Sequence, residues 1–94
     1  IMLKLVGHQQ VAILGMAYKP GTPVTEESMG RKLLKALRDD SVVVTTHDVV
    51  ARGEYADAER CMRGASAVVI ATPYEEYAKL DYGNRLVIDP WGLR

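Results

Sequence analysis

The feature that most constrains the fold is a set of short apolar runs, rich in β-branched residues, that recur along the chain. Each run is apolar at consecutive positions rather than at every second one, as in strands that are buried on both faces. The runs occupy residues 10–14, 41–47, 67–72 and 86–89. Because segments with helical spacing separate them, we predict a three-layer, Rossmann-like α/β fold. Its centre is an open parallel sheet of about four strands, with helices on both faces.

The segments between the runs have apolar residues three and four positions apart, which is typical of one face of a helix. The spacing predicts helices over residues 29–38, 54–63 and 74–80. In the second of them Tyr55, Ala58, Cys61 and Met62 share one stripe, so Cys61 is interpreted as a core residue. Gly64 follows where a helix cap is expected.

The rule that crossovers are right-handed leaves few possible layouts for such a sheet. We favour the strand order 2-1-3-4, in which the chain changes direction between strands 1 and 3. Open α/β sheets bind ligands beyond the carboxyl ends of the strands at such a switch point. Residues 15–28 and 72–75 form the loops that follow strands 1 and 3. They are therefore expected to meet at one crevice.

Composition narrows the possible functions. The chain has 94 residues, enough for one domain over residues 1–94, and its formal net charge is zero. Without a basic excess, nucleic-acid binding is not expected. No apolar stretch reaches the ~18–20 residues that span a bilayer, so no membrane association is expected. A single cysteine indicates a reducing, cytoplasmic setting. His8 and His47 are isolated, so no metal site is predicted.

The first loop, GMAYKPGT at residues 15–22, contains the residues that are best suited to binding a ligand. It matches neither the G-x-G-x-x-G fingerprint nor a Walker loop. Gly15 permits close approach of backbone, and Lys19 is a flexible charge that can reach a phosphate or a carboxylate. Thr22 and Ser28 carry hydroxyl donors, as does Thr25, and the following helix N-terminus favours an anion. The loop therefore suits an anionic ligand.

A simpler interpretation is that the loop only connects two elements. Lys19 would then be solvated, and Ser28 or Thr25 would cap the following helix. Glu26 and Glu27 favour this interpretation, because carboxylates in a first helical turn satisfy the helix dipole and repel a phosphate. Spacing alone does not decide between the two.

A resemblance to a known family adds to this picture. The matching stretches are VAILGMAYKPGT at residues 11–22, EES at 26–28, ASAVVIATPYEEYAKLD at 65–81 and LVID at 86–89. From about residue 7 to residue 92 the chain resembles the C-terminal domain of the UDP-glucose 6-dehydrogenase and GDP-mannose 6-dehydrogenase family. These stretches follow in the expected order over nearly the whole chain.

The resemblance implies part of an NAD-dependent enzyme that oxidises the C6 alcohol of a nucleotide sugar to the uronate. In that family an N-terminal Rossmann domain holds NAD, and a central region carries the cysteine nucleophile and the subunit contacts. The C-terminal domain binds the nucleotide part of the UDP-sugar. This chain is then a piece of a longer dehydrogenase, with no catalytic residue and no NAD site of its own. Its partners are the UDP-sugar and the rest of the dehydrogenase chain.

Particular residues follow from the matching motifs. Lys19 aligns with a loop lysine that contacts the UDP portion in the family. The substrate-binding residues predicted on this basis are Gly15, Tyr18, Lys19, Gly21, Thr22 and Trp91. On the cofactor side, Glu26 stands where the family has an arginine that helps to hold NAD, and Ser28 follows it in the same motif.

Two departures from the family pattern bear on activity. At position 26 a cation that pairs with phosphate has become an anion, and Pro23 and Val24 replace two expected aspartates. The family commonly ends its last strand with D-G-R, whose arginine contacts the nucleotide, whereas residues 89–92 read DPWG. Trp91 thus offers an aromatic face, and no arginine follows until Arg94. The alternative function is accordingly a degenerate Rossmann-like domain, kept for assembly or partner binding without a ligand.

Some polar and aromatic residues allow two interpretations. Asp48, at the end of the second strand, could meet a ribose hydroxyl or cap a turn. Tyr74, Tyr77 and Tyr82 are interpreted as packing or interface residues rather than base-stacking ones. Trp91 suits a ligand or interdomain contact, or packing against the sheet edge. A phosphoacceptor receiver domain fits poorly, since no acidic cluster surrounds a strand-end aspartate.

Overall fold

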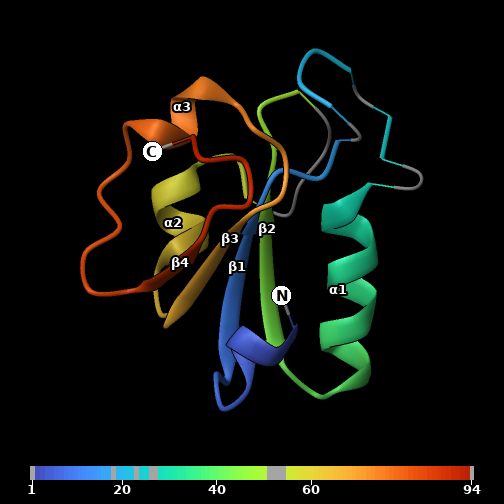
Figure 1. Cartoon of the computed structure of the whole chain (residues 1–94), viewed down its shortest axis with the longest axis vertical. Helices are drawn as coiled ribbons and strands as arrows, with labels where there is room; N and C mark the ends of the chain where they lie inside the picture. Colours follow the sequence, from blue (N-terminus) through green and yellow to red (C-terminus); the bar gives the residue numbers. More distant parts are fainter. Residues whose placement is uncertain (1, 18, 23, 26–27, 51–54, 94) are drawn as a thin grey trace.

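The computed structural model describes residues 2–17, 19–22, 24–25, 28–50 and 55–93 (Figure 1). Strands and helices alternate along these residues, as the apolar runs predict. The elements are η1 (Met2–Leu5), β1 (Gln10–Leu14), α1 (Met29–Asp39), β2 (Val43–His47), α2 (Ala58–Met62), β3 (Ala67–Ile70), α3 (Glu75–Ala78) and β4 (Leu86–Ile88).

The four strands form one sheet in the order β2-β1-β3-β4, and every pair is parallel (Figure 1). The predicted order is therefore confirmed. β1 lies in the middle, where Val11 is in register with Val44 of β2 and Ala67 of β3. Because all strands run the same way, their carboxyl ends share one edge, and the loops after β1, β2 and β3 start there.

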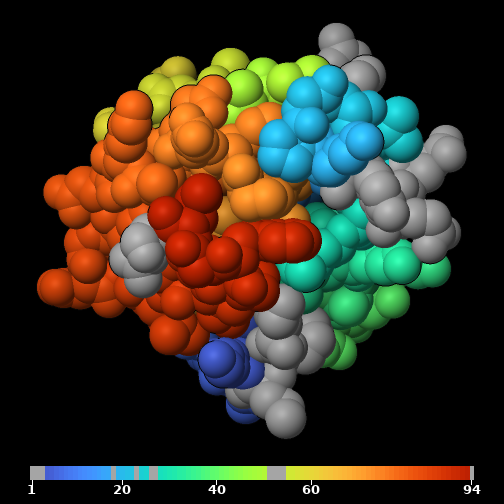
Figure 2. Space-filling model, turned by 45° about the horizontal axis from the view of Figure 1, so that its top comes forward, coloured from blue at the N-terminus to red at the C-terminus, as the bar shows by residue number. Residues whose placement is uncertain are grey.

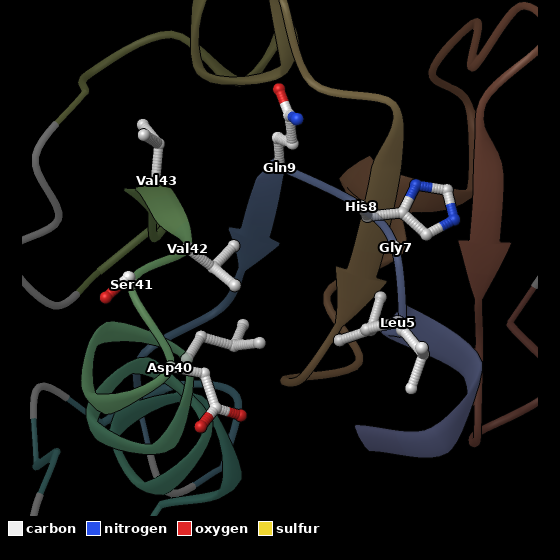
Figure 3. A pocket seen from close by; sticks show the side chains of 10 residues that line it. Leu5, Gly7, His8, Gln9, Asp40, Ser41, Val42 and Val43 are labelled. Carbon is white, nitrogen blue, oxygen red and sulfur yellow. The ribbon is translucent and has the colours of Figure 1, made fainter.

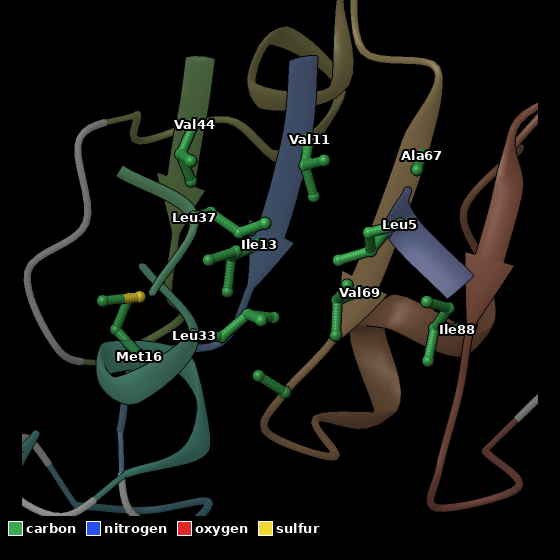
Figure 4. Packing of buried hydrophobic residues seen from close by; sticks show 11 residues of the cluster. Leu5, Val11, Ile13, Met16, Leu33, Leu37, Val44, Ala67, Val69 and Ile88 are labelled. Atoms are coloured by element: carbon green, nitrogen blue, oxygen red, sulfur yellow. The ribbon is translucent and has the colours of Figure 1, made fainter. Parts of the chain in front are cut away.

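One face of the sheet is covered by η1 and α1. Val11 and Ile13 of β1 point to this face and pack with Leu33 and Leu37 of α1 (Figure 4). Leu5 of η1 joins the same cluster. Apolar residues at helical spacing on α1 thus bury one stripe against the sheet, while the basic residues between them stay exposed.

The opposite face is covered by α2 and α3. Here Ala12 and Leu14, which alternate with the residues of the first cluster, pack with Cys61 and Met62 of α2 and Tyr77 of α3. Cys61 is fully buried, so its interpretation as a core residue is confirmed. Helices on both faces make the three predicted layers.

The first helix starts and ends close to the predicted positions. Ser28 caps α1, and its hydroxyl oxygen accepts a hydrogen bond of 3.1 Å from the Arg31 amide. At the other end Ser41 adopts a φ of 63° in the turn that leaves the helix. β2 therefore begins at Val43, two residues later than predicted.

The second helix is shorter than predicted, and its buried stripe differs. The Tyr55 amide donates to the Thr46 carbonyl at 2.9 Å, so Tyr55 lies beside β2 instead of starting a helix. Asp57 then caps α2, and its carboxylate accepts from the Glu59 amide at 2.9 Å. Tyr55 is 36% exposed, which contradicts its assignment to the buried stripe. Residue 54 lies outside the described part of the chain.

The remaining elements also end earlier than predicted. β3 stops at Ile70 because the amides of Ala71 and Thr72 both turn to the Leu14 carbonyl, at 2.8 and 3.4 Å. α3 spans four residues after Tyr74, whose backbone is extended. Across the described residues, none of the helices has the length and the apolar character that crossing a membrane requires.

Candidate functional site

A single carboxylate ties together the three loops at the carboxyl edge of the sheet. Oδ2 of Asp48, which directly follows β2, accepts hydrogen bonds from the amides of Met16 at 2.6 Å and Ala17 at 2.8 Å. Its Oδ1 accepts from the Val50 amide and from the Tyr74 hydroxyl, both at 2.8 Å. The loops after β1, β2 and β3 therefore share one anchor. The bond to Val50 is the turn cap that the sequence allows for Asp48.

The anchor is charged and nearly buried, with Asp48 only 8% exposed. Burial by itself raises the pKa of Asp48, but the hydrogen bonds from Val50, Ala17, Met16 and Tyr74 together outweigh it. The pKa therefore lies below its ordinary value. Burial and the bond to Asp48 raise the pKa of the Tyr74 hydroxyl, which remains a donor. The Asp48 carboxyl therefore stays ionised and the Tyr74 hydroxyl stays protonated, as the hydrogen bond between them requires.

A second link joins the loops that follow β1 and β3. The Thr72 hydroxyl donates to the Ala17 carbonyl at 2.8 Å, and Gly15 adopts a φ of 104° against Thr72. A Cβ at Gly15 would collide with Thr72, and one at Gly30 of α1 would collide with the Gly15 carbonyl oxygen. These groups are therefore in close contact just beyond the ends of β1 and β3.

The end of β2 is held by a third contact. Nδ1 of His47 lies 2.9 Å from the Tyr77 hydroxyl, and the Tyr82 hydroxyl donates to the Tyr77 carbonyl at 2.6 Å. Burial lowers the pKa of His47, although a hydrogen bond to the Ala56 backbone opposes this shift. Tyr74, Tyr77 and Tyr82 are all buried, which confirms their interpretation as packing residues.

The predicted substrate residues of the first loop occupy two environments. Gly15 is buried at the strand end, whereas Lys19 and Gly21 are exposed. The Thr22 hydroxyl oxygen accepts from the Val24 amide at 3.2 Å. Tyr18 lies outside the described residues. Lys19 therefore lies in the exposed part of the first loop. It comes two residues after Ala17, which is bonded to both Asp48 and Thr72.

Of the two predicted cofactor residues, the structure describes only Ser28. Ser28 is buried, and its hydroxyl oxygen serves as the cap of α1, as the simpler interpretation of the loop expects. Glu26 lies outside the described residues. A role for either residue toward NAD stays a prediction.

Trp91 reaches the same edge from the other end of the chain. Its Nε1–H donates to the Ile70 carbonyl at 3.0 Å, which places the ring at the carboxyl end of β3. Figure 2 shows the C-terminal segment (red), the loop after β1 (light blue) and the segment after β3 (orange) on one face of the molecule. They adjoin the first turn of α1 (teal). The predicted meeting of the two loops is confirmed by the bond between the Thr72 hydroxyl and the Ala17 carbonyl, whereas a crevice between them stays a prediction.

Two of the cavities do not involve the first loop. One of about 660 Å³ is at the amino ends of the strands, between η1 and the turn after α1 (Figure 3). Another, of about 600 Å³, lies at the carboxyl end of β2, between this strand and helices α2 and α3, and Asp48 itself lines it. Asp57, Glu59 and Glu76 also line this second cavity, and their negative charges disfavour an anion there.

Comparisons with known proteins agree with this architecture. Residues 12–93 match the profile of the UDP-glucose/GDP-mannose dehydrogenase family, UDP binding domain. The chain belongs to this family. It is 36% identical over 72 residues to a UDP-N-acetyl-D-mannosamine dehydrogenase of Pyrococcus horikoshii, covering 77% of this chain and 17% of that protein. It is 35% identical over 96 residues to a UDP-glucose 6-dehydrogenase of Haloferax volcanii, covering 86% of this chain and 22% of that protein.

Solved structures of the family have the same fold. A UDP-glucose dehydrogenase of Pyrobaculum islandicum superposes with a TM-score of 0.80 at 28% identity, over 86% of this chain and 21% of that one. The Pyrococcus horikoshii enzyme gives 0.78 at 32% identity, over 89% and 22%. The chain thus spans about a fifth of the length of these family members.

Within this UDP-glucose/GDP-mannose dehydrogenase family fold, the residues that anchor the loops are the hardest to predict from the sequence. The sequence allows Asp48 to cap a turn or to meet a ribose hydroxyl, but it does not indicate the bonds to Met16 and Ala17. Thr72 was placed at the crevice without a role. The available signal was position: Asp48 lies directly beyond one apolar run and Thr72 is the last residue of another, where loops meet in a parallel sheet.

Proposed function

We propose that this chain binds the nucleotide part of a UDP-sugar. In this proposal residues 1–94 are the C-terminal domain of a longer NAD-dependent nucleotide-sugar 6-dehydrogenase, which oxidises the C6 alcohol to the uronate. The observation that carries the proposal is the anchored first loop. Asp48 and Thr72 hold its start at Ala17, and the loop then displays Lys19 at the switch point of the sheet.

The charge and position of Lys19 support a diphosphate as the recognised group. The loop start is fixed by bonds of 2.6–2.8 Å to buried side chains, so part of the cost of ordering it is already met on folding. An exposed ammonium group then supplies attraction to phosphate. The membership of the chain in a UDP-binding family agrees with this assignment.

The chemical step belongs elsewhere in the longer enzyme. Cys61, the one cysteine, is fully buried in the core and cannot reach a substrate. The Ser28 hydroxyl, which was predicted on the cofactor side, is used as the cap of α1. The proposal therefore assigns NAD and the nucleophile to other parts of the dehydrogenase, and only nucleotide binding to this domain.

Calorimetric titration of the 94-residue chain with UDP and with uridine tests the proposal. Binding of UDP in the millimolar range or tighter is expected, with uridine weaker because it lacks the diphosphate. If UDP produces neither heat nor a rise in melting temperature at millimolar concentration, the domain is not a nucleotide-binding unit. The assembly-domain alternative, which the acidic residue at position 26 favours, would then take its place.

A further inference from the structure

The indole of Trp91 is held by a hydrogen bond although the residue is about half exposed. Its Nε1–H is bonded to the Ile70 carbonyl, and the residue remains 49% exposed. Trp91 also lies within a turn, in which the Gly92 amide donates to the Asp89 carbonyl at 3.3 Å. Since the only polar atom of the ring is satisfied inside the fold, the part open to solvent is aromatic carbon surface.

This surface lies on the same edge of the sheet as the first loop. Ile70 is the last residue of β3, and two residues later the Thr72 hydroxyl holds the Ala17 carbonyl. Lys19 follows Ala17 in the exposed part of that loop. The two segments that contain Trp91 and Lys19, from opposite ends of the chain, thus lie on one face of the molecule (Figure 2).

We propose that Trp91 is the base-stacking residue of this site, so that the planar base of a nucleoside diphosphate lies against its exposed ring. The inference rests on the proposed function and adds the group that recognises the base. A nucleoside diphosphate pairs an anionic part with a flat aromatic part, and the edge offers a partner for each. Stacking on an aromatic side chain needs an accessible face at a fixed position, which the bond to Ile70 provides.

Trp91 is the only tryptophan of the chain, which makes a direct test possible. Tryptophan emission and calorimetry are followed while the chain is titrated with UDP and, separately, with pyrophosphate as a probe without a base. We expect UDP to change the emission with the midpoint that calorimetry gives, and pyrophosphate to leave it unchanged. Free N-acetyltryptophanamide in the same titration corrects for absorption by the nucleotide.

Two substitutions complete the test. Trp91→Leu is expected to weaken UDP binding about tenfold, as the loss of one stacked base implies, while changing pyrophosphate binding by less than about twofold. Trp91→Phe keeps an aromatic ring and should retain more of the affinity for UDP than Trp91→Leu. This second variant keeps the test valid if the leucine variant folds poorly. Tyr55→Leu removes an exposed aromatic side chain beside β2 and should bind UDP like the wild type.

The outcomes separate this inference from the proposal on which it rests. If calorimetry detects UDP binding but the emission does not change and Trp91→Leu binds UDP normally, the stacking role is wrong and the UDP site stands. If calorimetry detects no binding of UDP or pyrophosphate, the nucleotide-binding function itself fails, and the inference fails with it.

Discussion

The Tyr74 hydroxyl donates a hydrogen bond of 2.8 Å to Oδ1 of Asp48, and so joins the loop after β3 to the residue that follows β2. The other oxygen of the same carboxylate holds the amides of Met16 and Ala17 after β1. The position of the Lys19 loop therefore depends on two side chains that do not belong to it. This dependence leads to separate predictions for stability and for binding.

Asp48→Asn should destabilise the chain by about 2–3 kcal/mol, because an amide replaces a charged acceptor of four hydrogen bonds and turns an N–H₂ group toward donors. Urea unfolding measures this change in the free energy of unfolding. Asp81→Asn is the matched control, since Asp81 accepts from the Gly83 amide at 2.9 Å in an exposed turn. A loss for Asp48→Asn no larger than for Asp81→Asn would show that the carboxylate does not anchor the loops.

Tyr74→Phe should cost about 1 kcal/mol, the usual net value of one hydrogen bond, and its effect should depend on Asp48. The double variant with Asp48→Asn should lose less free energy of unfolding than the sum of the two single losses, because both substitutions remove the same bond. Strict additivity in a double-mutant cycle would contradict a direct contact between the two side chains.

Gly15→Ala should be among the most damaging single changes in the chain. It combines a φ of 104° with a Cβ that would collide with Thr72, so a loss of more than ~3 kcal/mol is expected. Gly21→Ala is the control. Its φ is also positive, at 87°, but the added Cβ meets no atom within 4 Å, so a loss of only ~1 kcal/mol is expected. Equal melting temperatures for the two variants would refute the close contact between β1 and β3.

Stability should fall as the pH drops below about 6.5, the ordinary pKa of histidine. Burial lowers the pKa of His47, so the folded state prefers the neutral ring and the unfolded state takes up the proton first. Its contribution is complete above the unfolded pKa and is lost as the pH falls from there through the lower folded pKa. Unfolding free energies at pH 7.5 and 5.5 measure the loss.

The substitution His47→Asn should make this pH dependence smaller. A His47→Asn variant with the full wild-type dependence would assign the acid sensitivity to another group.

The fold could be predicted from the sequence because its signals are local. Consecutive apolar residues in the runs identified parallel strands, and the spacing of Leu33 and Leu37 identified the buried face of α1. The errors were at element ends, where tertiary bonds decide. Tyr55 pairs with Thr46 instead of starting α2, and periodicity carries no information about that pairing.

The site was predictable only in part for the same reason. The motif predicted Lys19 and the loop around it, and the strand order predicted the edge at which the loop lies. The bonds that position the loop connect Asp48 and Thr72 to Ala17, across 31 and 55 positions of sequence. Contacts at such separations follow from the register of the sheet, which composition and spacing do not specify.

The most direct test of the account is the affinity of the Lys19→Ala variant for UDP, measured by calorimetry beside Lys35→Ala. Lys35 is an exposed lysine on the outward side of α1, so its removal changes the net charge equally. Lys19→Ala should weaken UDP binding about fivefold, the equivalent of ~1 kcal/mol for one exposed charge pair. Lys35→Ala should leave it unchanged. Equal affinities for UDP in the wild type and both variants would contradict the claim that the anchored loop presents Lys19 to a diphosphate.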